Sequence, residues 1–198
     1  MTFPIQDPFA WFLQEYQEAV DAKIPDPNAM QLATVTREGT PSVRTVLYKG
    51  LVRGGFSFYT NYHSQKSQDL TVRKRASLNF FWPELQRQIR VEGVAERLTR
   101  AESEAYFRSR ARLSQIGAWA SEQSAEIPNF EWLEKRVQEF EKKFAGQDVP
   151  CPEDWGGFHV LPLKMEFWFG RQGRLHERFI FERSEPLATA WNRYLKSP

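Results

Sequence analysis

The stretch from residue 164 to residue 183, KMEFWFGRQGRLHERFIFER, constrains the fold more strongly than any other part of the chain. Two runs of alternating character flank a short turn bounded by Gly170 and Gly173, which is the usual signature of a β-hairpin. Side chains of a strand alternate between its two faces. In the second run, one face therefore carries Leu175, Phe179 and Phe181, and the other carries Arg174, His176 and Arg178.

This row of three basic side chains has two interpretations. Like charges two residues apart on one face repel each other, so the row favours binding of an anionic ligand. The alternative is an ordinary solvent-exposed basic strand in which Glu177 and Glu182 act as nearby partners. These residues alone are compatible with both interpretations.

Length and composition narrow the class of protein. A chain of 198 residues is long enough for a sizeable core, so we expect a single domain over 1–198. The net charge is only +2, and basic and acidic residues are interspersed, which argues against a general binder of nucleic acids or membrane surfaces. The lone cysteine, Cys151, excludes an internal disulfide, and three scattered histidines argue against a metal site. With no signal-peptide pattern and no apolar run of about 18 residues, a cytoplasmic protein is expected.

The first part of the chain predicts a helix followed by strands. Asp7 and Pro8 are typical of a helix start, and the helix is expected to end near Ala22 with an apolar stripe of Phe9, Phe12, Tyr16 and Val20. Short turns then separate three runs of strand character, which predicts an antiparallel meander of 30–36, 42–49 and 56–61. A short helix capped by Ser64 comes before two further strands, at 78–82 and 86–98.

The second part adds helices and returns to strands. Thr99 and Glu102 form a capping box that begins a helix running to about Ser109, and a second helical segment rich in small residues follows over 114–123. After Pro128, an amphipathic helix carries a stripe expected in the core: Phe130, Leu133, Val137, Phe140 and Phe144. A separate strand near 158–161 precedes the hairpin. This order predicts an α+β fold, with an antiparallel sheet or barrel and peripheral helices.

Several separate elements offer donors to an anion. Tyr106 and Arg110 stand four residues apart, and Ser114 extends the same stripe if the helix resumes or continues, so a phenol, a guanidinium and a hydroxyl could share one phosphate. The alternative is a surface arginine beside a half-buried tyrosine. Arg44 and Lys49 differ by an odd number, so they would serve one site only across a bulge or a strand end. The surplus of donors suggests two phosphorylated small molecules or one large one.

Seven stretches carry a resemblance to a known family, and they span most of the chain: DPNAMQLATV, PSVRTVLYKG, FYTNYHSQK, LQRQIRVEG, YFRSRARLSQIGAWASEQS, VPCPEDWGGF and EFWFGRQGRLHER. The chain resembles the pyridoxine/pyridoxamine 5'-phosphate oxidases, FMN-dependent enzymes that make pyridoxal 5'-phosphate. The resemblance implies an antiparallel split β-barrel of the FMN-binding type. It also implies a homodimer with two FMN sites at the subunit interface, in which the region 155–198 contributes to the dimer and the active site.

The resemblance also implies roles for individual residues. FMN would be held by Arg44, Lys49, Tyr59, Thr60, Lys66, Gln88, Gln123, Ser124, Trp168 and Arg178. The substrate phosphate would meet Lys49, Tyr106, Arg110 and Ser114. Arg174 and His176 would be catalytic and lie against the pyridine ring. A hydride would pass from substrate C4' to flavin N5, and O2 would then reoxidise the flavin to give H2O2.

Two departures from the family pattern lie next to the expected flavin site. Gln65 stands where the family usually has a second basic residue beside the lysine, and Phe169 replaces a usual glutamine. Three other functions are considered. One is a flavin oxidase of the same fold that acts on another substrate, as in phenazine-pathway relatives. The others are a non-catalytic carrier of a cofactor or pyridoxal phosphate, and an aromatic-rich barrel that binds single-stranded nucleic acid.

Overall fold

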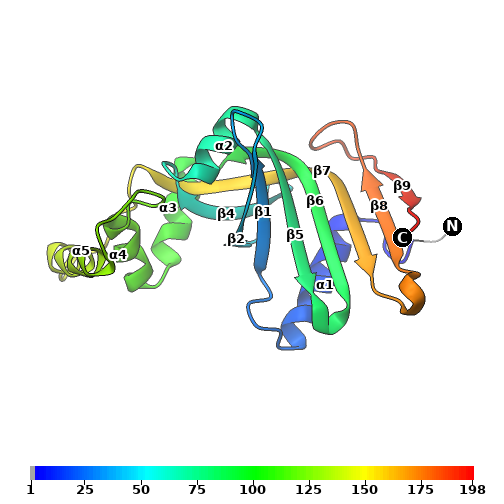
Figure 1. Cartoon of the computed structure of the whole chain (residues 1–198), viewed down its shortest axis with the longest axis horizontal. Helices are drawn as coiled ribbons and strands as arrows, with labels where there is room; N and C mark the ends of the chain where they lie inside the picture. The colour runs from blue at the N-terminus through cyan, green and yellow to red at the C-terminus, as the bar shows by residue number, and fades with distance from the viewer. Residues whose placement is uncertain (1–2) are drawn as a thin grey trace.

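The computed structural model describes residues 3–198. Its strands form one antiparallel sheet in the order β2-β1-β5-β6-β7-β4-β3, with β8 beside β7 and β9 beside β8 (Figure 1). The strands are β1 (Ala29–Val35), β2 (Pro41–Leu47), β3 (Leu51–Val52), β4 (Gly55–Asn61), β5 (Arg75–Trp82), β6 (Arg87–Arg97), β7 (Trp155–Phe169), β8 (Glu177–Glu182) and β9 (Asn192–Leu195). The helices are α1 (Pro8–Asp21), α2 (Gln65–Arg73), α3 (Arg100–Ser109), α4 (Arg112–Ala120) and α5 (Phe130–Lys143), with short 3-10 turns at Pro83–Leu85 and Gln172–Arg174. The predicted antiparallel α+β split-barrel fold is confirmed, with an open sheet in the described part of the chain.

Helix α1 packs against the inner face of the sheet and forms the centre of the core. It begins as predicted, because the Asp7 carboxylate accepts hydrogen bonds from the first free amides of the helix. Phe12 is fully buried, and its ring lies 4.7 to 5.3 Å from the rings of Phe56, Phe80 and Tyr48. Burial of this aromatic cluster is the main apolar contact between the helix and the sheet.

A buried ionic contact fixes the other face of α1. Glu15 accepts hydrogen bonds from Trp11 Nε1 at 2.9 Å and from Arg87 at 2.5 Å, and Arg87 also pairs with Glu18. Burial raises the pKa of Glu15. The predicted stripe is wrong at Val20, which is 39% exposed, because the helix turns the face of Trp11, Glu15 and Ala19 inward.

Strand β7 is longer than expected and joins two parts of the sheet. The sequence predicts two separate strands here, whereas the structure has one strand of 15 residues. Its first half pairs with β4 and β6, and its second half pairs with β6 and β8. A bulge interrupts the ladder, since Glu92 pairs with Lys164 but Gly93 pairs with Pro162. The residue without a partner on β6 is Leu163, and Pro162, which has no amide donor, lies beside this bulge.

The predicted meander is wrong. Strands β1 and β2 form a hairpin, but β4 pairs with β3 and β7 and has no ladder with β2. The short connection between β2 and β4 predicted that these two strands pair. In the structure, β4 pairs instead with β7, which is distant in sequence. Long-range pairing of this kind leaves no local sequence signal.

Helix α5 is only partly packed. Its asparagine cap and its amphipathic stripe are present, and Phe144 at its end is buried. Phe130, predicted in the core, is 79% exposed, because the cluster that holds this helix includes Val137, Phe140 and Phe144 further along the chain and not its first residue. Figure 1 shows α5 at the far end of the molecule from β8 and β9.

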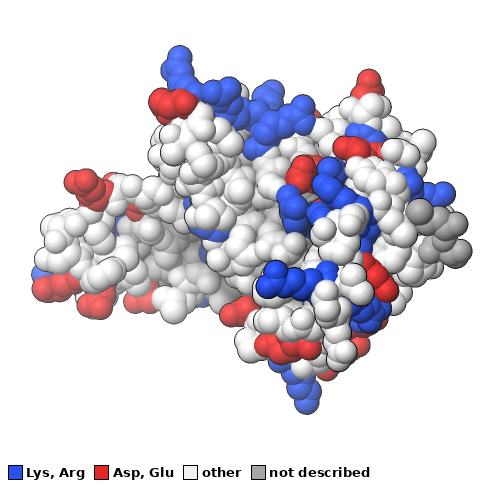
Figure 2. Space-filling view, turned by 45° about the vertical axis from the view of Figure 1, so that its right-hand side comes forward, with Lys and Arg blue, Asp and Glu red and all other residues white. Residues whose placement is uncertain are grey.

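The surface carries charges of both signs. Figure 2 shows lysine and arginine side chains interspersed with aspartate and glutamate over the face in view. Among residues 3–198, no helix has the length and apolar character needed to cross a membrane.

The bulge between β6 and β7 gives a test of the fold. A Cβ atom at Gly93 would lie 2.1 Å from the backbone oxygen of Leu161, so Gly93→Ala should lower the free energy of unfolding by about 2 kcal/mol or more. Gly117→Ala is the matched control. It meets no atom within 4 Å in helix α4 and should stabilise by about 0.5–1 kcal/mol. Urea unfolding measures both, and equal stabilities would contradict the close approach.

Candidate functional site

An open cavity of about 900 Å³ lies between strands β2 and β4 and helices α2, α3 and α4. Its lining includes two thirds of the site residues expected from the sequence: Arg44, Lys49, Tyr59, Thr60, Lys66, Tyr106, Arg110, Ser114, Gln123 and Ser124. Strand β2 ends at Leu47, so Lys49 escapes the alternation of the strand and shares the cavity with Arg44. The expected strand end is therefore present.

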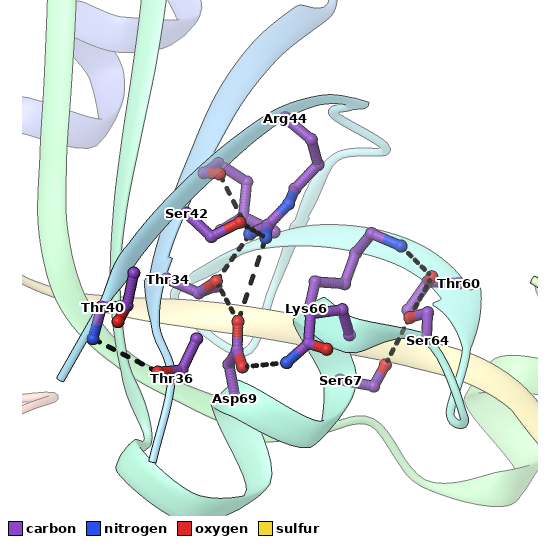
Figure 3. A network of polar contacts seen from close by, with 12 residues as sticks. Thr34, Thr36, Thr40, Ser42, Arg44, Thr60, Ser64, Lys66, Ser67 and Asp69 are labelled. Carbon is purple, nitrogen blue, oxygen red and sulfur yellow. Dashed lines mark hydrogen bonds and ion pairs between the residues drawn. The ribbon is translucent and has the colours of Figure 1, made fainter. Parts of the chain in front are cut away.

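One end of the cavity is built from cations and hydroxyl groups (Figure 3). Arg44 donates hydrogen bonds to Thr34 Oγ1 and Ser42 Oγ, each at 2.6 Å. Lys66, in the first turn of α2, donates to Thr60 Oγ1 at 3.2 Å and to Gln123 Oε1 at 3.1 Å. The hydrogen-bond acceptors of both cations are neutral oxygens, and the nearest carboxylate, that of Asp69, lies 3.9 Å from the Arg44 guanidinium.

Desolvation weakens the proton affinity of Lys66. Its burial lowers the pKa to about 8, and repulsion from Arg44 contributes in the same direction. Burial also raises the pKa of Tyr59 to about 12. An anion bound beside Lys66 would restore the lost stabilisation of its ammonium form, so anion binding is expected to depend on pH near 8.

Aromatic rings form a wall of the same cavity. Tyr59 and Tyr106 stack with centroids 3.9 Å apart, and Trp155 continues the stack 5.5 Å from Tyr59. The guanidinium of Arg110 lies 4.8 Å from the centroid of Trp155, a cation–π contact. Its Nη1 atom is buried and has no hydrogen-bond partner. This unpaired donor at the cavity wall is suited to an anionic ligand.

A break between two helices brings three of the predicted donors to the cavity. The predicted end of the helix near Ser109 is confirmed, and the chain becomes helical again at Arg112. Arg110 lies between the two helices with an extended backbone, so it does not share one helical stripe with Tyr106. Buried Gln115 on α4 donates to the carbonyl oxygens of Phe107 and Arg108, which ties α4 to the end of α3. Tyr106, Arg110 and Ser114 line the cavity from both sides of this break.

The small residues of α4 face the cavity. Its lining includes Ala111, Ser114, Gly117, Ala118 and Ser121, which recur three or four apart and so share one helix face. The sequence indicated a segment rich in small residues but not its purpose. Short side chains keep this side of the cavity wide. Trp155, which the sequence also left without a role, lies in one of the stretches that carry the family resemblance.

The remaining expected residues form a second group at the other end of the sheet. Gln88, Trp168 and Arg178 are direct cross-strand neighbours on β6, β7 and β8. Arg178 donates from Nε to the buried carboxylate of Glu166 at 2.7 Å, and this ion pair raises the pKa of Arg178. The centroids of His176 and Trp168 are 4.6 Å apart.

The predicted alternation of Arg174, His176 and Arg178 is wrong. Strand β8 begins at Glu177, and a longer connection with a 3-10 turn replaces the expected tight turn. Arg174 has a left-handed backbone with φ of 63°, and Leu175 is 73% exposed instead of packing inward. The two strands pair only from Phe169 and Glu177 onward, so face alternation places neither Arg174 nor His176.

A backbone contact fixes the form of the His176 ring. The amide of Arg171 donates to His176 Nδ1 at 3.1 Å, so the neutral ring carries its proton on Nε2. Arg171 also pairs with Glu177 at 2.9 Å across the same connection. His176 therefore offers a donor, whereas exposed Arg174 contributes charge beside it.

Comparison with known proteins decides the family. The family described as "Pyridoxamine 5'-phosphate oxidase" matches residues 16–144, and the "Pyridoxine 5'-phosphate oxidase C-terminal dimerisation region" matches residues 155–198. The chain belongs to this family. A pyridoxine/pyridoxamine 5'-phosphate oxidase of Bdellovibrio bacteriovorus is 53% identical over 98% of this chain and 97% of its own. One of Rubrobacter xylanophilus is 48% identical over 97% of this chain and 87% of its own.

Solved structures share the architecture. PhzG from Burkholderia lata 383, solved in complex with tetrahydrophenazine-1-carboxylic acid, superposes with a TM-score of 0.92 at 28% identity and covers 100% of this chain and 98% of its own. A pyridoxamine 5'-phosphate oxidase-related, FMN binding protein from Nostoc punctiforme has a TM-score of 0.78 at 14% identity and covers 97% and 98%. The second likeness concerns the fold alone.

Metal ligands are not grouped in the part of the chain that the structure describes. Across residues 3–198, no set of three or more His, Cys, Asp and Glu side chains is arranged to hold a metal ion.

The lowered pKa of Lys66 predicts pH-dependent anion binding. Sulfate is a suitable probe because its charge is constant in this range. Its affinity should be steady below about pH 7 and fall as the pH rises through about 8, where Lys66 loses its proton. Lys66→Arg keeps its charge and should give a flat profile. Isothermal titration from about pH 6.5 to about pH 9.5 compares them, and parallel profiles would contradict the assignment to Lys66.

Proposed function

We propose that this protein is an FMN-dependent oxidase that converts pyridoxine 5'-phosphate or pyridoxamine 5'-phosphate to pyridoxal 5'-phosphate, with O2 reduced to H2O2. The observation that carries the proposal is the cavity with two separate sets of anion donors. Arg44 and Lys66 lie at one end, and Tyr106 and Arg110 come from the break between α3 and α4. The curated relatives at about half identity carry the name of this activity.

The residues present fit FMN at the first set. A phosphate monoester needs cationic and hydroxyl donors, and Arg44, Lys66 and Thr60 supply them around one end of the cavity. Gln123 and Ser124 line the same region and add an amide and a hydroxyl. The buried ammonium of Lys66 also supports a phosphate here, because a bound anion would compensate the cost of its burial.

The second set fits the phosphate of the substrate. The free Nη1 of Arg110 would pair with a phosphate oxygen, and the Tyr106 and Ser114 hydroxyls would complete the site together with Lys49. Stacking on Tyr59 and Trp155 keeps the Tyr106 ring in place, and the contact with Trp155 limits the rotamers of Arg110. Anchoring both phosphates orients the reactants, which is the principal contribution that the protein makes to such a reaction.

Bound FMN would supply the hydride acceptor and the reaction with dioxygen. The chain's own residues would bind and orient the substrate. The Nε2–H group of His176 would donate a hydrogen bond to a polar group of the substrate ring. The Arg174 guanidinium would favour the anionic form of that polar group. Trp168 beside His176 would exclude water from this region.

The two groups of site residues would meet in a homodimer. Trp155 in the cavity and Trp168 in the second group are 13 positions apart on β7, so they lie up to about 43 Å apart along one strand. Phe81, which is 49% exposed, continues the row of Gln88, Trp168 and Arg178 on the same face of the sheet. An exposed phenylalanine in this row favours burial against a second copy, and the family match over residues 155–198 is described as a dimerisation region.

A flavin oxidase with another substrate is the second candidate. The likeness to PhzG, solved with a tetrahydrophenazine carboxylate, favours it. The donors at the break between α3 and α4 favour a phosphorylated substrate instead, because a carboxylate would leave part of this set unpaired.

Anaerobic flavin reduction tests the proposed function. The purified protein should be yellow, and adding pyridoxine 5'-phosphate without oxygen should bleach its flavin absorbance. Air should restore the absorbance and give H2O2 and pyridoxal 5'-phosphate. Unphosphorylated pyridoxine and a dihydrophenazine carboxylate are the controls. Bleaching by either of them with equal efficiency would count against the phosphorylated substrate.

Complementation between two inactive variants tests the shared site. Arg110→Ala and Arg174→Ala should each lose most activity, since they remove donors from the cavity and from the β7–β8 connection. The two variants are then denatured together and refolded as an equal mixture. About half of the dimers should be mixed, and each mixed dimer should have one intact site, so the mixture should recover about a quarter of the wild-type sites. Arg108→Ala, on an exposed part of α3, is the control. An inactive mixture would mean that both groups serve one protomer.

A further inference from the structure

A buried carboxylate lies directly behind the cations of the cavity. Asp69, in helix α2, is only 3% exposed, and its Oδ2 lies 3.9 Å from the guanidinium of Arg44 (Figure 3). The sequence alone assigns it no role, because a single aspartate inside a short helix is normally a solvated residue. A charge buried this deeply requires partners, and those partners connect it to the anion site.

Thr34 relays the effect of Asp69 to Arg44. The hydroxyl of Thr34 donates to Asp69 Oδ2 at 2.6 Å, and this leaves a lone pair of the same hydroxyl oxygen to accept from Arg44 Nη1 at 2.6 Å. The carboxylate thus fixes the direction of the Thr34 hydroxyl. With Ser42 and the Leu32 carbonyl as further acceptors, Arg44 is held in place before any ligand arrives.

Gln65 belongs to the same network. Its amide donates to Asp69 Oδ1 at 2.8 Å, so both carboxylate oxygens are satisfied. The side chain next to Lys66 therefore binds Asp69, and it adds no positive charge to this end of the cavity. The phosphate end of the cavity has two cations, Arg44 and Lys66, and one buried anion behind them.

We propose that Asp69 is a positioning residue with a counter-charge, which orients Arg44 through Thr34 and lowers the affinity of this end of the cavity for a phosphate group. The inference rests on the proposed assignment of this end to the flavin phosphate. Attraction to Arg44 stabilises the empty site, and the same charge repels an incoming phosphate. Because the site is partly desolvated, the repulsion is weakly screened.

Asp69→Asn separates charge from geometry. The oxygen of the introduced amide can still accept from Thr34, and its NH2 group can face the Gln65 oxygen after a flip of the Gln65 side chain. The full-length protein, freed of flavin, is titrated with FMN and with riboflavin, which has the same ring without phosphate. Asp69→Asn should bind FMN about fivefold to tenfold more tightly than wild type and riboflavin with unchanged affinity. The gain should shrink at high salt.

Asp21→Asn is a matched control. Asp21 accepts from Gln17 four residues earlier at 2.8 Å, the same spacing and distance as Asp69 and Gln65, but it is exposed at the end of α1. Its replacement should change neither affinity. Gln65→Leu removes one partner of Asp69 while keeping its charge, and it should not tighten FMN binding. If Asp69→Asn does not fold, Asp69→Ser removes the same charge and takes its place.

The outcomes separate the inference from the proposed function. Unchanged or weaker FMN binding by folded Asp69→Asn overturns the counter-charge, and so does an equal gain for riboflavin or for Gln65→Leu. A wild-type protein that binds neither flavin instead contradicts the proposed function.

Discussion

The pairing of β7 with three other strands is the constraint on which the rest of the structure depends. This strand holds β4 at one end and β8 at the other, and β6 runs along nearly its whole length. The cavity lies beside its first half, where Trp155 joins the aromatic wall. The second group of site residues lies near its last residues, at Trp168. The close approach at Gly93 allows β7 to bend between these two regions without leaving the sheet.

Electrostatics explains why the cavity is prepared for an anion. Lys66 and Arg110 are partly desolvated, and burial lowers the pKa of both. Lys66 donates hydrogen bonds to the neutral oxygens of Thr60 and Gln123, and Arg110 lies against the ring of Trp155. None of these neighbours cancels a positive charge. Asp69 is the exception at this end, since it is anionic and buried. A bound phosphate would thus stabilise the buried cations of the site, and the one carboxylate would reduce this stabilisation.

Local signals in the sequence predicted local structure well. The Asp7 cap and the Thr99 capping box begin helices where expected, because each depends on residues within one helical turn. The family resemblance supplied the residues of the cavity, and the structure brings ten of them together. Long-range features had no such signal. The pairing of β4 with β7 joins two segments that are far apart in sequence. Arg174 was misplaced for a different reason, because strand alternation does not apply in the connection before β8, where Arg174 has a left-handed backbone.

The length of β7 has a consequence for how such a chain can change. Trp155 and Trp168 serve two different groups of residues from one rigid element. Inserting or deleting a single residue between them would move Trp168 to the opposite face of the sheet and alter the spacing of the two groups. The bulge at Gly93 already accommodates one extra residue in this interval. An insertion or deletion in this interval would therefore displace half of the proposed site at once.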